Sequence, residues 1–225
     1  MPHVAGAPAG SVGSTTVAAL VLAGGRASRM GGADKALVVV GGVTLLDRVL
    51  SAARPLAGTL AVAGPNRPTA VPGVVFRPDP GPAAGPVPPI LALAGTCEEG
   101  SVLLVVAVDM ALVTSADLAR LIAPVAGGTA LAAAALDDGG RANPLLAAYQ
   151  VEYLCSTAAS SGLGPGSAAR LLLAGAGPDG VTLVSLRPGV TLNLNTPADL
   201  ELAEALIAAA ARGDQQSPPL GPPEP

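Results

Sequence analysis

Histidine is almost absent from this 225-residue chain, and the one that occurs, His3, lies in an N-terminal stretch rich in Gly, Pro and Ser. Such a stretch has little apolar surface to bury, so we expect it to be a flexible tail. A single histidine outside the folded part argues against Ser-His-Asp triads, Cys-His nucleophiles and histidine-ligated metal sites. The chemistry is therefore expected to rely on carboxylates, amides, cations or a hard metal ion.

Cysteines and aromatic residues are also scarce. Cys97 and Cys155 form neither a close pair nor a CxxC motif, which argues against a disulfide framework or a cysteine zinc site. Both are expected to be buried thiols. Aromatic residues make up 1% of the chain, the net charge is −4 and no basic run occurs. A nucleic-acid surface needs basic patches, so we expect no nucleic-acid partner and interpret any bound nucleotide as a free one.

Uninterrupted apolar segments of membrane-spanning length are missing as well. Half of the residues are hydrophobic, but Asp117 and Arg120 break one long run, and Asp137 and Asp138 close another. The N-terminus has no basic cluster ahead of an apolar core, so it lacks the anatomy of a signal peptide. We therefore expect no membrane helix and a cytoplasmic location.

The chain does contain short Val/Leu-rich runs that alternate with longer Ala/Leu segments carrying charges at helical spacing. That alternation predicts a single α/β domain with a mainly parallel sheet flanked by helices. We expect this domain at 17–212, between flexible tails at 1–16 and 213–225. Ser115 and Thr196 are expected to be helix N-caps, with Pro197 at the first helical position. Strands are predicted at 18–22, 59–63, 74–76, 102–108, 129–136, 145–149 and 181–186, and helices at 44–53, 87–96, 115–124, 151–160, 167–173 and 196–211.

A glycine-rich loop follows the first predicted strand directly, with the sequence Ala23-Gly-Gly-Arg26-Ala-Ser-Arg29-Met-Gly-Gly-Ala-Asp-Lys35. Glycines allow backbone N–H groups to converge on an anion, and Arg26, Arg29 and Lys35 would neutralise a polyphosphate held there. Lys35 is the one lysine among twelve lysines and arginines, and a compact ammonium on a flexible stem suits a phosphate. We interpret the loop as a triphosphate cradle; a Gly-rich turn with solvated arginines is the alternative.

Neither of two common phosphate-loop motifs explains this segment. The loop contains no G-x-x-x-x-G-K-[ST], and no G-x-G-x-x-G follows the first strand. A G-x-G-x-x-G does occur at 175–180, but it follows a predicted helix, contains Pro178 and precedes a strand. That order of elements is wrong for a dinucleotide site, so an oxidoreductase of that kind is not favoured.

Polar side chains follow two further predicted elements. Asp109 comes directly after the strand at 102–108, at the edge of the sheet where ligands of α/β proteins gather. One carboxylate there suffices for Mg²⁺, which also takes phosphate oxygens and keeps water. Asn193 and Asn195 alternate around Leu194, so both amides lie on one side of an extended segment, within reach of metal, ribose or phosphate. An ordinary strand-end Asp and turn-forming asparagines are the alternatives.

Asp79 lies in a loop at 77–86 that is rich in proline and glycine. Proline restricts the backbone, so this loop is stiff despite its length. Such a loop suits a pocket wall, and it suits a plain surface loop equally well.

Four motifs occur in a fixed order along the chain and together resemble the molybdenum cofactor guanylyltransferase family. Leu22–Lys35 is similar to that family's signature L-A-G-G-x-S-x-R-M-G-x-D-K. The other three are Asp79 with Gly85-Pro86, Val108-Asp109-Met110, and Asn193-Leu-Asn-Thr-Pro-Ala-Asp-Leu200. The resemblance implies a single-domain Rossmann-like fold of the nucleotide-diphospho-sugar transferase type. It also implies transfer of GMP from magnesium GTP to the terminal phosphate of molybdopterin, with release of pyrophosphate.

The resemblance further implies roles for single residues. Arg29, Lys35 and Asp109 would be catalytic. Mg²⁺ is the implied cofactor, held by Asp109 and Asn195 with Asn193 as a possible additional ligand. The implied partners are GTP, molybdopterin, and a molybdoenzyme or cofactor-delivery protein. Nucleotide binding falls to Leu22, Ala23, Gly24, Gly25, Arg26, Lys35, Asn66, Asp79 and Asp109, among which Asn66 and Asp79 would recognise guanosine.

Three departures from the family pattern bear on the substrate. Val87-Pro-Pro-Ile90 stands where the family has Leu-Ala-Gly, Ala111 stands where a proline is usual, and Arg141-Ala-Asn-Pro144 replaces a His-Pro near the expected pterin site. Leu22-Ala-Gly-Gly and the two asparagines favour GTP over the CTP of related cytidylyltransferases. A relative that uses CTP or another phosphorylated acceptor, and a non-catalytic accessory protein that binds nucleotide or cofactor, remain the alternatives.

Overall fold

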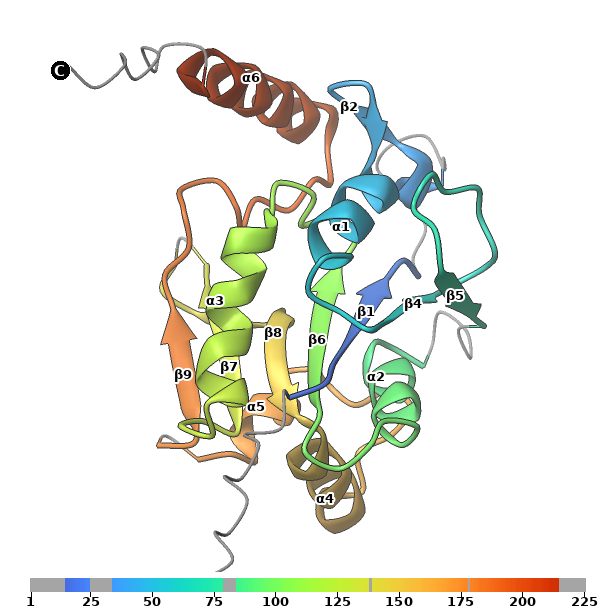
Figure 1. Ribbon diagram of the computed structural model, residues 1–225, viewed down its shortest axis with the longest axis vertical. Helices are drawn as coiled ribbons and strands as arrows, with labels where there is room; N and C mark the ends of the chain where they lie inside the picture. Colours follow the sequence, from blue (N-terminus) through green and yellow to red (C-terminus); the bar gives the residue numbers. More distant parts are fainter. Residues whose placement is uncertain (1–14, 25–33, 79–83, 138, 178, 215–225) are drawn as a thin grey trace, which may run out of the picture.

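The computed structural model describes residues 15–24, 34–78, 84–137, 139–177 and 179–214. A seven-stranded sheet runs through the middle of the molecule, with helices on both of its faces (Figure 1). In spatial order its strands are β5 (Val74–Arg77), β4 (Thr59–Ala63), β1 (Val17–Leu22), β6 (Val102–Ala107), β8 (Ala142–Gln150), β7 (Ala132–Leu136) and β9 (Val181–Val184). Strand β8 runs antiparallel to β6 and β7, and the other pairs are parallel. The predicted α/β class with a mainly parallel sheet is confirmed.

Two layers of helices cover the sheet. Helices α1 (Leu45–Ala53) and α3 (Ser115–Ala126) pack on one face, and α2 (Val87–Ala94), α4 (Val151–Ser161) and the short α5 (Leu171–Ala174) pack on the other. Helix α6 (Pro197–Asp214) lies at one end, beside a small hairpin of β2 (Val39–Val40) and β3 (Val43–Thr44) (Figure 1). A 3-10 turn, η2 (Lys35–Leu37), precedes that hairpin.

Strand β1 shows why the sheet is buried on both faces. Ala19 and Val21 belong to the core beneath α1 and α3, whereas Leu20 and Leu22 belong to the core beneath α2 and α4. Side chains alternate along a strand, so a run that is apolar at every position buries both faces. The same alternation in β6 makes these two strands the centre of the molecule.

Three local predictions are wrong, each for a local reason. Thr114, not Ser115, caps α3, because its side chain and that of Asp117 bond each other's backbone N–H groups in a capping box. Strand β7 begins three residues later than predicted, since α3 continues past Pro124 to Ala126 and a turn follows. The helix expected at 167–173 forms only at Leu171–Ala174.

Two further observations differ from expectation. The β2–β3 hairpin was not predicted; its turn uses Gly41 and Gly42 at φ +56° and +77°, which suit a two-residue hairpin turn. Cys97 is partly buried, but Cys155 is exposed, so the expectation of two buried thiols is wrong for Cys155. Over the described part of the chain, no helix combines the length and the apolar character needed to cross a bilayer.

The parallel strands bring the predicted site residues to one edge of the sheet. Leu22, the last residue of β1, pairs with Ala107, the last residue of β6. The segments that leave these strands, which begin the glycine-rich loop and carry Asp109, therefore emerge side by side.

Candidate active site

Lys35 joins the two polar segments that the sequence singled out. Its Nζ donates a hydrogen bond to Asp109 Oδ2 at 2.7 Å and another to Asn195 Oδ1 at 2.6 Å. These partners lie 74 and 160 positions away along the chain. The ammonium, the carboxylate and the amide thus form one cluster at the carboxyl edge of the sheet.

The backbone around Asp109 is fixed by its neighbours. Val108 N–H donates to Leu22 O at 3.0 Å, which extends the β1–β6 pairing by one step. Leu194 N–H donates to Asp109 O at 3.3 Å, and the Leu194 side chain is fully buried. The segment that carries Asn195 is therefore fastened directly to the residue that carries the carboxylate.

Asn195 is held by the start of helix α6. Asp199 Oδ2 accepts from the N–H groups of Asn195 at 2.9 Å and Thr196 at 2.7 Å, and Thr196 Oγ1 accepts from Asp199 N at 3.2 Å. The predicted N-cap at Thr196 is confirmed. The backbone N–H of Asn195 and the hydroxyl of Thr196 hold the pKa of Asp199 below its usual value, which keeps the cap ionised.

The other oxygen of Asp109 is a candidate ligand atom. Asp109 Oδ1 is buried and has no hydrogen-bond partner among the described residues. An unsatisfied buried carboxylate oxygen is costly, and a hard cation would compensate it. The described ranges hold no group of three His, Cys, Asp or Glu side chains, so a magnesium ion here would also need phosphate oxygens and water. The residues present fit Mg²⁺ bound together with a nucleotide.

Arg67 was not identified from the sequence, yet it contacts both ends of the glycine-rich loop. Its Nη2 donates to Ala23 O at 3.2 Å and its Nε donates to Asp34 Oδ2 at 2.6 Å. The Arg67 side chain is 6% exposed. Gly64 leaves room for it: a Cβ there would lie 2.8 Å from Arg67 Nη1, and Gly64 adopts φ +148°. The sequence held no signal for this role, because the burial of Arg67 and its partners appear only in the folded chain.

The remaining predicted residues are placed as follows. Leu22 and Ala23 are buried, so their side chains face the core and only backbone groups and the exposed Gly24 reach the edge. Asn66 and Asn193 are exposed, and neither takes part in the Lys35 cluster. Gly25, Arg26, Arg29 and Asp79 lie outside the described residues. The roles assigned to all of these residues remain predictions.

The structure explains residues 87–90, where this sequence departs from the family's Leu-Ala-Gly. Val87, Pro89 and Ile90 are buried, and α2 starts at Val87 with proline in its first turn. Proline is tolerated there because the first N–H groups of a helix lack internal partners. This substitution therefore packs the start of α2.

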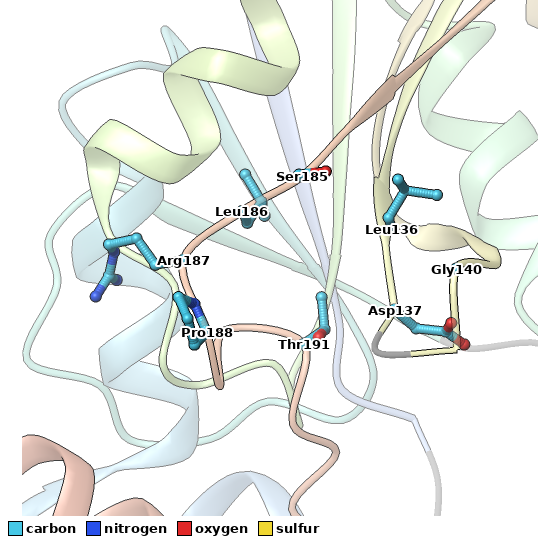
Figure 2. Close-up of a pocket in the computed structure, with 8 residues that line it drawn as sticks. All are labelled: Leu136, Asp137, Gly140, Ser185, Leu186, Arg187, Pro188 and Thr191. Atoms are coloured by element: carbon cyan, nitrogen blue, oxygen red, sulfur yellow. The ribbon is translucent and has the colours of Figure 1, made fainter.

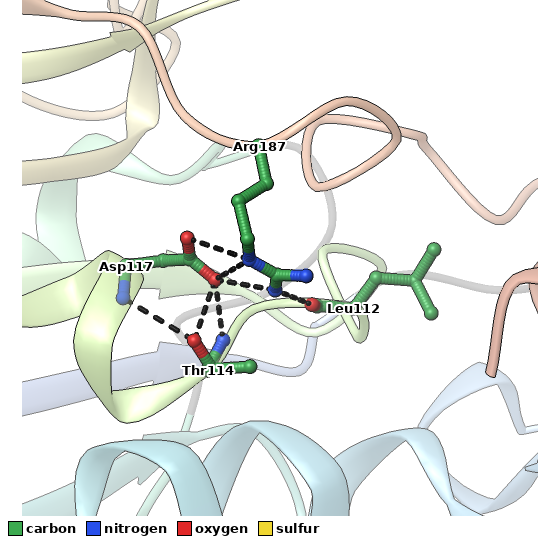
Figure 3. A network of polar contacts seen from close by, with 4 residues as sticks. All are labelled: Leu112, Thr114, Asp117 and Arg187. Atoms are coloured by element: carbon green, nitrogen blue, oxygen red, sulfur yellow. Dashed lines mark hydrogen bonds and ion pairs between the residues drawn. The ribbon is translucent and has the colours of Figure 1, made fainter. Parts of the chain in front are cut away.

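A second polar network fastens the segment after β9 to helix α3 (Figure 3). Arg187 Nη2 donates to Asp117 Oδ2 at 2.6 Å and Arg187 Nε donates to Asp117 Oδ1 at 3.1 Å. Arg187 Nη2 also reaches Leu112 O at 3.3 Å. Burial opposes ionisation of Asp117, but hydrogen bonds from Arg187 and Thr114 outweigh it and hold the pKa of Asp117 below its usual value.

A cavity of about 340 Å³ lies beside this network, where β7 and β9 end (Figure 2). Since β7 and β9 run parallel to β6, the cavity is at the same sheet edge as Asp109. Its wall contains hydroxyl, carboxylate and apolar groups. Its volume is in the size range of small-molecule sites. The lining residues are Leu136, Asp137, Gly140, Ser185, Leu186, Arg187, Pro188 and Thr191.

Comparison with known proteins identifies the family. Residues 19–185 match the family described as the MobA-like NTP transferase domain. The chain belongs to this family. The assignment confirms the resemblance found in the four sequence motifs and makes the chain a member of a nucleotidyltransferase family.

Relatives of this NTP transferase carry consistent names. A protein of Cereibacter sphaeroides named molybdenum cofactor guanylyltransferase is 36% identical over 198 residues, covering 84% of this chain and 95% of that protein. A protein of the same name from Xanthomonas euvesicatoria is 37% identical over 105 residues, covering 47% of this chain. That match spans 53% of the Xanthomonas protein, about half of its length.

Solved structures agree on the NTP transferase fold. The 2-C-methyl-D-erythritol 4-phosphate cytidylyltransferase of Thermus thermophilus is 26% identical with a TM-score of 0.61, over 86% of this chain and 100% of that one. The molybdopterin-guanine dinucleotide biosynthesis protein A of Archaeoglobus fulgidus is 21% identical with a TM-score of 0.62, over 85% and 98%. The predicted transferase-type fold is confirmed.

Proposed function

We propose that this chain transfers GMP from magnesium GTP to the terminal phosphate of molybdopterin, releasing pyrophosphate and forming the guanine dinucleotide cofactor. The observation that carries the proposal is the convergence of Lys35, Asp109 and Asn195 at the edge where the glycine-rich loop begins. Relatives named molybdenum cofactor guanylyltransferase support the choice of a guanylyl group and a molybdenum cofactor acceptor.

In the proposed reaction, an oxygen of the acceptor phosphate bonds to the α-phosphorus of GTP. The bond from that phosphorus to the oxygen bridging to the β-phosphate breaks, and pyrophosphate leaves with the electron pair. The attacking phosphate is already anionic at neutral pH, so no histidine base is needed. Catalysis then consists of positioning and charge neutralisation, which is the chemistry that this site offers.

Each side chain of the cluster has a part in that chemistry. Lys35 neutralises phosphate oxygens of the nucleotide, and Asp109 with Asn195 would hold Mg²⁺. When bound, Mg²⁺ supplies positive charge next to the transferring phosphate. Arg67 keeps the two ends of the glycine-rich loop together, so that the backbone N–H groups of the loop can cradle the phosphates.

The cavity beside Ser185 and Thr191 is proposed to receive the acceptor. It lies at the same edge as Asp109, on the side of β6 away from β4 and β5. The hydroxyl groups of Ser185 and Thr191 offer hydrogen bonds, and Leu136 and Leu186 offer apolar contact, a combination that suits a polar heterocycle. Because GTP is a cytoplasmic metabolite, we propose that the reaction takes place in the cytoplasm.

Pyrophosphate release by the purified protein tests the proposal. Magnesium, molybdopterin and either GTP, CTP, ATP or UTP are combined in separate reactions, with Asp109→Asn as the matched inactive variant. Release with GTP alone supports the proposal. Preference for CTP would move the chain to the cytidylyl relatives, which share the fold. No release with any nucleotide would contradict transfer to molybdopterin and favour another acceptor or an accessory role.

A further inference from the structure

The contacts of Lys35 conflict with separate roles for Lys35 as a phosphate ligand and for Asp109 and Asn195 as metal ligands. Asp109 Oδ2 and Asn195 Oδ1 belong to the two side chains proposed to hold Mg²⁺, yet both oxygens accept hydrogen bonds from the Lys35 ammonium. Magnesium needs oxygen ligands at about 2.0–2.1 Å in an octahedral arrangement. An ammonium bonded to the same two oxygens uses one lone pair of each and repels a second cation.

We propose that Lys35 serves as a resident counter-ion that excludes divalent cations from the site until a nucleotide binds. The triphosphate would draw the ammonium onto its own oxygens and thereby free Asp109 Oδ2 and Asn195 Oδ1 for the metal. This inference rests on the proposed function in one respect, that the site binds a nucleoside triphosphate. It sets an order of binding, in which metal enters with or after the nucleotide.

The geometry supports this role for Lys35 in three ways. The ion pair is mostly enclosed, because the side chains of Lys35 and Asp109 are 15% and 21% exposed, so solvent screens the repulsion of a second cation weakly. Asn195 is neutral, so Asp109 is the one carboxylate among the two side chains bonded to Lys35, and the ammonium balances its charge. Asp109 Oδ1 is left as one buried oxygen, which is too few ligands for a magnesium ion without a nucleotide.

The flexible stem of lysine makes the exchange possible. A compact ammonium can leave one anion for another by rotating single bonds, whereas the planar fork of an arginine is committed to one geometry. Every other strong cation of the chain is an arginine. The single lysine therefore stands at the position where a movable charge is needed.

Because the chain contains one lysine, its motion can be followed without a mutation. Protein labelled with ¹³C at the lysine Cε gives one lysine signal by NMR. We expect GTP in the presence of a chelator to shift that signal, and millimolar Mg²⁺ without nucleotide to leave it unchanged. A shift with Mg²⁺ alone as large as the shift with GTP would overturn the inference.

Metal affinity gives the second test. Free Mn²⁺ is measured by electron paramagnetic resonance with nucleotide-free protein, for wild type, Lys35→Met and Lys35→Gln. Removing a like charge next to a ligand oxygen should strengthen Mn²⁺ binding by about tenfold or more in either variant. Arg120→Met, which removes an exposed charge on α3, is the matched control and should bind Mn²⁺ as wild type does.

The outcomes separate this inference from the proposed function, since neither experiment needs turnover. An unchanged or weaker Mn²⁺ affinity in both Lys35 variants would overturn the counter-ion role, even if wild type transfers GMP. Stronger Mn²⁺ binding in the variants supports it, even if wild type releases no pyrophosphate with molybdopterin.

Discussion

The guanidinium of Arg187 donates two hydrogen bonds to the carboxylate of Asp117, from Nη2 at 2.6 Å and from Nε at 3.1 Å (Figure 3). The two residues are 70 positions apart in the sequence. The Asp117 side chain is 3% exposed and that of Arg187 is 51% exposed. The contact joins the segment that leads to Asn195 to the helix that follows Asp109. One ion pair outside the site thus links the two segments that carry its residues.

Loss of this ion pair should destabilise the fold. Arg187→Ala leaves the buried Asp117 charge without its main partner, and we expect the free energy of unfolding to fall by about 3 kcal/mol, measured by urea titration. The matched control is Arg141→Ala, which removes an exposed i,i+4 pair with Asp137 and should leave the free energy of unfolding almost unchanged. Equal costs in the two variants would contradict the buried role of Asp117.

The same pair predicts a direction of pH dependence. The pKa of Asp117 is lower in the folded chain than the unfolded value of about 3.9, so its ionisation stabilises the fold above that value. That stabilisation should disappear as the pH falls through the lowered folded pKa. Asp117→Asn should therefore differ from wild type in unfolding free energy by a constant amount between pH 5 and 8, and the difference should shrink below about pH 4. A difference that grows on acidification would refute this account.

Lys35→Ala and Asp109→Ala should each abolish GMP transfer while the fold stays intact. Both side chains act on charge at the reaction centre, and loss of one such group lowers turnover by roughly a hundredfold or more. Pyrophosphate release measures the activity, and circular dichroism with a thermal melt measures the fold. Near-normal turnover in either variant would remove that residue from the proposed mechanism.

Arg67→Met should weaken nucleotide binding specifically. The substitution keeps a buried apolar stem but removes the bonds to Ala23 O and Asp34, which tie together the ends of the glycine-rich loop. We expect the KM for GTP to rise by about tenfold, the scale of a lost charge-assisted hydrogen bond, with little change in the KM for the acceptor. Similar changes in both KM values would indicate general misfolding instead.

Filling the cavity beside Ser185 should weaken binding of the acceptor and leave binding of GTP unchanged. Ser185→Leu places a larger side chain in a cavity of about 340 Å³, so we expect the KM for molybdopterin to rise by roughly tenfold while the KM for GTP is unchanged. Ser160→Leu, an exposed substitution on α4, is the control and should alter neither value. An unchanged acceptor KM in Ser185→Leu would place the acceptor elsewhere.

Much of the fold follows from local sequence signals. Strand β1 is apolar at every position, which predicts a strand buried on both faces. The strand predicted at 59–63 has the observed ends of β4. Thr196 and Pro197 start a helix because a side-chain cap and a fixed φ act within one turn. Asp109 was identified because a carboxylate directly after a buried strand must emerge at the sheet edge.

Other features depend on contacts between distant segments, and the sequence did not predict them. The antiparallel direction of β8 is set by its pairing with β6 and β7, since its own residues suit either direction. Arg67 and Arg187 were indistinguishable from solvated arginines, because a side chain's burial and its partner are properties of the packed chain.

The sequence by itself determined the chemical groups of this site: a lone lysine in a glycine-rich loop, a strand-end aspartate and a pair of asparagines before a capped helix. Local sterics and hydrogen bonding fix such features within a few residues. Only the tertiary structure decided that Lys35 bonds Asp109 and Asn195 together and that Asn193 lies outside their cluster. Those pairings depend on how strands and helices far apart in the chain pack around one sheet.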